Sequence, residues 1–80
     1  MTLDPTPDVV LDCLGRPCPV PVIEVARALP TLAVGAVVEV LSDDPAARHD
    51  LPAWCRMRGQ DYLGELTRER GAAYRIRRVS

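Results

Sequence analysis

Cys18 is the residue of this chain whose type and surroundings best suit covalent chemistry. It lies in the stretch LDCLGRPCPVPVIEVARAL, residues 11–29, where prolines mark the start of a helix. The unpaired N–H groups and the dipole at a helix N-terminus favour negative charge, so the pKa of a thiol placed there is expected to be lowered. Arg16, which precedes Cys18 closely, would add a positive field. A thiolate in such a place is a nucleophile toward sulfur or electrophilic carbon.

Pro19 and Pro21 occupy the first turn of the expected helix. They remove two N–H donors from that turn, so their main contribution is rigidity, which holds the thiol outside the helix. The alternative interpretation is a buried and inert Cys18, because free cysteine is among the most buried residue types. The turn residues before Cys18 and the helix start after it favour the reactive interpretation.

The chain holds two further cysteines and one histidine. Cys13 either packs at the end of a strand or acts as a resolving thiol that closes a disulfide with Cys18. Cys55 shares a helix face with Leu51, so we expect a structural role for it. The spacing of His49 and the cysteines does not resemble a common zinc pattern, and we predict no metal site.

Apolar runs and stop signals predict the elements that position Cys18. They are a strand at 9–11, a helix from 18–21 to Pro30, a strand at 36–41, a helix from Asp50 to Gly59, and strands at 60–67 and 73–79 joined through Arg70 and Gly71. In the last strand, Tyr74 and Ile76 share one face, and Arg75 and Arg77 share the other. This β-α-β-α-β-β order predicts an α/β two-layer sandwich, with a four-stranded mixed sheet and two helices on one face.

Aspartates surround the start of the second helix. Asp43, Asp44 and Asp50 are expected to cap and terminate elements, and a partner's basic surface is a secondary expectation for them. Asp50 is the preferred helix cap because Pro52 would then lie in the first turn. Pro45, which follows Asp44, is the alternative start of a short turn or helix.

Size and composition limit the classes of protein that fit. Eighty residues make one domain, which we place at residues 8–80 after a flexible tail at 1–7. The formal net charge of −1 argues against a nucleic-acid surface. Neither a secretory signal nor an apolar run of membrane-spanning length is present in the sequence. The odd cysteine count suits a reducing cytoplasm better than a disulfide framework.

The chain resembles the TusA family of sulfur-carrier proteins, whose members are also called SirA-like. The matching pieces run from Val9 to Val79 and are LDCLGRPCPVP, ARAL, VGAVVEVLSDDPAARHDLPAWCRMRG and a closing hairpin. CPVP matches the family's Cys-Pro-x-Pro signature, and the DDP and DLPAWC blocks follow at the family's spacing. Cys13 is not a required part of that signature.

The resemblance implies that Cys18 carries a persulfide, with Arg16, Pro19 and Pro21 as supporting residues. A cysteine desulfurase or a rhodanese would load it, and an acceptor protein would unload it in tRNA thiolation, cofactor biosynthesis or sulfur metabolism. The partners would supply the chemistry, so we expect a monomer without cofactor, metal, nucleic acid or membrane, and its status as an enzyme stays open. The alternatives are a non-enzymatic regulatory or interaction module and a redox switch between Cys13 and Cys18.

Overall fold

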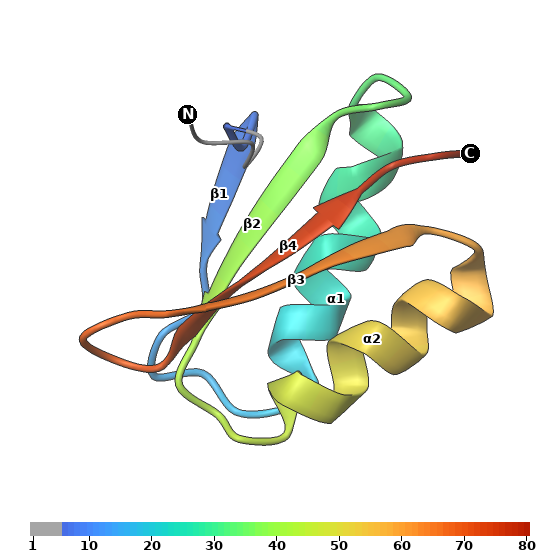
Figure 1. Ribbon diagram of the computed structural model, residues 1–80. Helices are drawn as coiled ribbons and strands as arrows, with labels where there is room; N and C mark the ends of the chain where they lie inside the picture. The colour runs from blue at the N-terminus through green and yellow to red at the C-terminus, as the bar shows by residue number, and fades with distance from the viewer. Residues whose placement is uncertain (1–5) are drawn as a thin grey trace.

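Four strands form one mixed sheet, and two helices cover one of its faces (Figure 1). The computed structural model describes residues 6–80. Its elements are β1 (Val9–Asp12), α1 (Val20–Ala28), the short 3-10 helix η1 (Leu29–Thr31), β2 (Val37–Ser42), α2 (Ala47–Arg58), β3 (Asp61–Thr67) and β4 (Ala72–Arg77). The predicted fold class is therefore confirmed. Residues 1–5 of the expected N-terminal tail lie outside the described residues.

The order of strands across the sheet is β1-β2-β4-β3. β1 runs parallel to β2, with Val9 opposite Val38, and β4 is antiparallel to both β2 and β3. Because β1 and β2 are parallel, their carboxyl ends lie at the same edge of the sheet. The segment that leads from β1 into α1 therefore lies beside the segment that leads from β2 into α2, and Cys18 belongs to the first of them.

The core lies between the sheet and the two helices. Alternation along the strands turns Tyr74 and Ile76 inward, where they are paired with Val40 and Val38 of β2. The helical layer contributes the buried side chains Val25, Leu29, Leu51, Trp54 and Cys55. Each fully buried aliphatic side chain contributes about 1.5–3 kcal/mol to folding, so this interface holds the two layers together. No helix within residues 6–80 has the length and apolar character needed to cross a membrane.

The other face of the sheet carries charge pairs, as the predicted alternation in β4 requires. Glu39 of β2 is only 7% exposed. Its Oε1 accepts hydrogen bonds from Arg75 Nε at 2.9 Å and from an Arg68 guanidinium nitrogen at 3.4 Å. A buried carboxylate is costly unless it is paired, and the two arginines provide that pairing.

The start of α2 differs from the prediction. The helix begins at Ala47 rather than at Asp50, and Pro52 lies inside it. The carboxylate of Asp44 accepts the N–H of Ala46 at 2.8 Å, and its carbonyl accepts the N–H of Ala47 at 3.1 Å. These bonds hold the turn at Pro45, which was the alternative start, and α2 follows from Ala47, so Asp50 is not its cap. Gly59 ends α2 at φ +70, as predicted.

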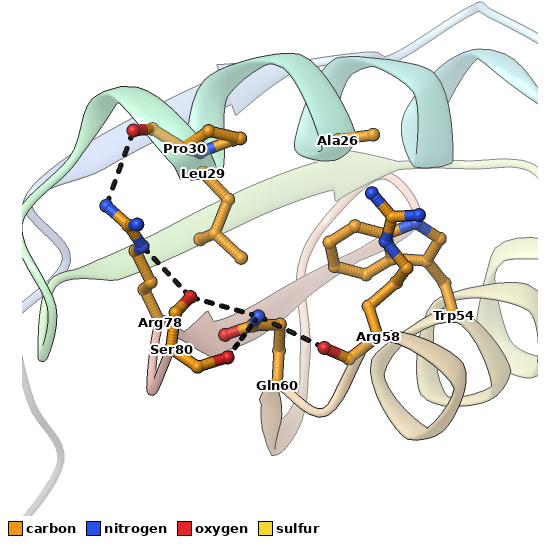
Figure 2. A pocket seen from close by; sticks show the side chains of 8 residues that line it. All are labelled: Ala26, Leu29, Pro30, Trp54, Arg58, Gln60, Arg78 and Ser80. Atoms are coloured by element: carbon orange, nitrogen blue, oxygen red, sulfur yellow. Dashed lines mark hydrogen bonds between the residues drawn. The ribbon is translucent and has the colours of Figure 1, made fainter.

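The carboxyl end of α1 is tied to the segment that follows β4 (Figure 2). Pro30 lies in η1, where the α-helix has ended. Arg78 Nη1 donates to the carbonyls of Pro30, at 3.3 Å, and Leu32, and so satisfies oxygens that the helix end leaves free. The surrounding pocket of about 260 Å³ also contains Trp54 and Gln60. The polar side chains of this pocket, Arg78 and Gln60, form hydrogen bonds within the protein. The pocket lies at the opposite end of α1 from Cys18.

Candidate functional site

Cys18 lies in the segment between β1 and α1, and its side chain is exposed. α1 begins two positions later, where the N–H of Val20 donates to the carbonyl of Pro17 at 3.0 Å and the N–H of Ile23 to that of Pro19 at 3.0 Å. Pro21 lies in the first turn of α1, as expected, and is buried. Pro19 was expected in that turn as well, but it precedes the helix and is exposed. The placement agrees with the expected exposed thiol beside a helix N-terminus, while the role assigned to Cys18 stays a prediction.

Two aspartates of the segment between β2 and α2 hold the segment that carries Cys18. The Oδ1 atom of Asp43 accepts the N–H of Gly15 at 3.0 Å, and Oδ2 of Asp44 accepts the N–H of Cys18 at 2.8 Å. Asp43 also forms an ion pair with Arg70 of the β3–β4 hairpin at 2.8 Å. We call these two residues the aspartate clamp, because they fix the backbone on which the thiol is mounted.

A third aspartate contacts the thiol itself. Cys18 Sγ donates a hydrogen bond to Oδ2 of Asp50, in the first turn of α2, at 2.7 Å. This hydrogen bond is the main reason that the pKa of Cys18 is raised, and partial desolvation and the negative charges of Asp50 and Asp44 act in the same direction. The predicted lowering of this pKa is therefore wrong. Arg16 is not among the causes at Cys18. At Cys13, burial and then the charge of Glu24 raise the pKa, and the charge of Arg16 only opposes this rise.

The other two cysteines belong to the core. Cys13 and Cys55 are each 1% exposed. Burial raises the pKa of Cys13, and burial raises the pKa of Cys55 to about 11, so both are held as thiols. This confirms the structural placement expected for Cys55 and supports the packing interpretation of Cys13. Within residues 6–80, no three His, Cys, Asp or Glu side chains gather as a metal site would need, and His49 is exposed.

The contact between Cys18 and Asp50 is the site feature that the sequence interpretation missed. Asp50 was expected to cap a helix, and its partner lies 32 positions away along the chain. A signal was nevertheless present in the expected element order. The first two strands are joined through a helix, and such strands are parallel with both following segments at one edge. The aspartates after the second strand were therefore candidates to meet Cys18.

The aspartate clamp makes the stability of the protein sensitive to acid. The N–H of Gly15 lowers the pKa of Asp43, and the N–H groups of Ala46 and then Cys18 lower that of Asp44. A carboxyl group whose pKa is lower in the folded state stabilises the fold above its unfolded value of about 3.9, and this contribution is lost as the pH falls through the folded pKa. We therefore expect the urea midpoint to fall as the pH drops below about 4.

The contribution of the clamp to this loss is measured by substitution. Asp44→Asn should show a smaller fall in the urea midpoint between about pH 7 and pH 3 than the wild type, because it has no proton to take up. Glu69→Gln is the control, since it removes the charge of an exposed acidic residue that is not part of the aspartate clamp. Equal pH dependence of Asp44→Asn and the wild type would contradict the assignment.

Comparisons with known proteins agree on one family. The family model for "Sulfurtransferase TusA" matches residues 9–78. A sulfur carrier protein TusA of Pseudomonas putida strain GB-1 is 40% identical over 60 residues, 75% of each chain. A putative sulfur carrier protein of Archaeoglobus fulgidus is 41% identical over 53 residues, 66% of this chain and 69% of that one. The crystal structure of a SirA-like protein of Desulfitobacterium hafniense superposes with a TM-score of 0.78 at 31% identity, covering 90% of this chain and 99% of the other.

Proposed function

Because the chain belongs to the TusA family of sulfur carrier proteins, we propose that it accepts sulfane sulfur as a persulfide on Cys18 and passes this sulfur to an acceptor protein. The observation that carries the assignment is the difference in exposure between the cysteines. Cys18 is exposed, whereas Cys13 and Cys55 are each 1% exposed. A sulfur atom that moves between proteins must be reachable by the active-site cysteine of each partner.

The transfer is a thiol exchange at sulfur. The Cys18 thiolate attacks the terminal sulfur of a donor persulfide, a new S–S bond forms at Sγ, and the S–S bond of the donor breaks. The donor cysteine leaves as a thiolate and takes up the proton that the Cys18 thiol has lost. Unloading is the same reaction with the acceptor cysteine as the attacking thiolate. The number of S–S bonds is unchanged in each step, so no external oxidant or reductant is consumed.

The surrounding residues suit this role. Pro19 and Pro21 fix the chain on the carboxyl side of Cys18, and the aspartate clamp fixes it on the other, so the thiol is presented by a rigid mount. Arg16 is exposed on the same segment, where it would meet a partner. Residues 8–80 would act as one carrier domain and as a monomer, in the cytoplasm, with a cysteine desulfurase or a rhodanese as donor.

Persulfide loading tests the assignment directly. The protein is incubated with a cysteine desulfurase and cysteine, or with a rhodanese and thiosulfate, and its intact mass is measured. We expect the wild type to gain one sulfur atom, about 32 Da, which a reducing agent removes. Cys18→Ser should gain none, because serine forms no persulfide.

Cys55→Ala is the matched control and should load like the wild type, since Cys55 is buried in the core. Loading of Cys18→Ser to the wild-type level would refute the proposal. A wild-type protein that gains no sulfur from either donor system would refute it as well.

A further inference from the structure

The carboxylate of Asp50 is committed to the thiol of Cys18. Its Oδ2 atom accepts the Sγ hydrogen bond at 2.7 Å, and among residues 6–80 this carboxylate has no cationic partner. The two clamp aspartates differ in this respect. Asp43 pairs with Arg70, and Asp44 accepts the N–H groups of Cys18 and Ala46. Of the three aspartates, Asp50 is the one whose side chain forms its hydrogen bond with the sulfur atom of Cys18.

Such a hydrogen bond favours one protonation state of the thiol. A carboxylate is only an acceptor, so the bond exists only while Sγ carries its proton. Ionisation would break the bond and bring two negative charges close together. Asp44 adds a further negative charge from the segment before α2. Arg16, on the segment of Cys18 itself, is exposed and forms no ion pair within the described residues 6–80.

We propose that Asp50 is a positioning residue of the sulfur-carrying site, which holds the Cys18 thiol in one orientation and in its protonated form while the protein is free. The inference rests on the proposed function, since it describes the state of the carrier before a sulfur donor binds. The protonated thiol is a poor nucleophile and resists oxidation. When a docked donor displaces the carboxylate, the thiolate forms where the donor persulfide lies, and its proton passes to the departing donor thiolate.

The position of Asp50 makes this arrangement sensitive to docking. Asp50 comes from α2 and Cys18 from the segment before α1, so the hydrogen bond joins two separate elements. A partner that binds over the exposed thiol also touches the first turn of α2. Displacement of one side chain is then sufficient to free the sulfur, and no backbone movement is required.

The reaction of Cys18 with iodoacetamide measures its ionisation without any partner. The rate is followed by peptide mass analysis over roughly pH 5 to 10, because only the thiolate reacts at an appreciable rate. Asp50→Asn keeps the size of the side chain, removes its charge and offers an N–H donor to the thiolate. We expect the pH profile of Cys18 to move to lower pH and its rate at about pH 7 to rise about threefold or more, after allowing for the lower nucleophilicity of a more acidic thiol.

Three controls separate this effect from loss of structure. Glu69→Gln neutralises an exposed acidic residue outside the aspartate clamp, and it should keep the wild-type profile more closely than Asp50→Asn. Asp50→Glu restores the charge and should move the profile back toward the wild type. Cys55 is buried, so its alkylation in the same sample reports unfolding, and the rates are compared where Cys55 stays unmodified.

An Asp50→Asn profile that coincides with the wild type, or lies at higher pH, would overturn the inference. So would an Asp50→Glu profile that coincides with that of Asp50→Asn, because the restored charge would then have no effect. These outcomes are independent of persulfide loading. If loading succeeds and the profile does not move, only the role of Asp50 is lost. If the profile moves and Cys18 never loads, the proposed function is lost while the restraint on the thiol stands.

Discussion

Gly71→Ala is expected to lower the free energy of unfolding by about 2–4 kcal/mol. Gly71 lies in the β3–β4 hairpin at φ +67, where a residue with a Cβ pays about 1 kcal/mol. A Cβ at this position would also lie 2.2 Å from the carbonyl oxygen of Ser42 and 2.7 Å from Cα of Asp43. These are backbone atoms, so they can retreat only by moving the segment that carries the aspartate clamp.

Gly59→Ala provides the matched control for this substitution. Gly59 has almost the same φ, +70, and nothing lies within 4 Å of the Cβ that alanine would add. Urea unfolding of both variants should therefore show a loss of about 1 kcal/mol for Gly59→Ala and a clearly larger loss for Gly71→Ala. If the two losses are equal, the close approach of the hairpin to Ser42 is not a constraint on the fold.

Leu51→Ala is expected to cost about 2–5 kcal/mol of stability. Leu51 is 0% exposed and lies in α2 against the core, next to the aspartate that contacts Cys18. Truncation removes buried apolar contacts and leaves a cavity between α2 and the sheet, which rigid neighbours fill only in part. In a domain of this size, a loss near the upper end of the range would leave little stability.

Met57→Ala in the same helix is the control for Leu51→Ala. Met57 is 74% exposed, so its truncation should change the free energy of unfolding by less than about 0.5 kcal/mol. Both values come from urea unfolding followed by circular dichroism. A Leu51→Ala variant as stable as Met57→Ala would mean that α2 does not depend on this side chain for its packing.

The order of elements was predictable because local signals agree with the fold. The β-branched run at 36–41 became β2, the prolines of CPVP mark the start of α1, and Gly59 ends α2. The first residue of α2 was harder to predict from the sequence, because two aspartate–proline signals compete in that region. The helix starts after Asp44 because the side chain of Asp44 accepts the N–H of Ala46 and its carbonyl accepts the N–H of Ala47, the first residue of α2.

The site itself was only half predictable. The exposure of Cys18 follows from a loop position before a helix, which sequence patterns indicate well. The protonation of its thiol depends on Asp44 and Asp50, which lie 26 and 32 positions away. A local reading sees only the helix dipole and Arg16, both of which favour the thiolate, and therefore predicts the wrong direction for the pKa. Long-range contacts made by the fold outweigh these local fields.

The hydrogen bond between Cys18 and Asp50 also distinguishes the free carrier from the carrier that is loaded with sulfur. In a persulfide the inner sulfur bears no hydrogen, so Sγ can no longer donate to Oδ2, and the hydrogen bond that holds the carboxylate beside it is lost. The orientation of one acidic side chain on α2 would thus differ between the loaded and the free protein. An acceptor that reads this orientation could tell a full carrier from an empty one before any sulfur moves.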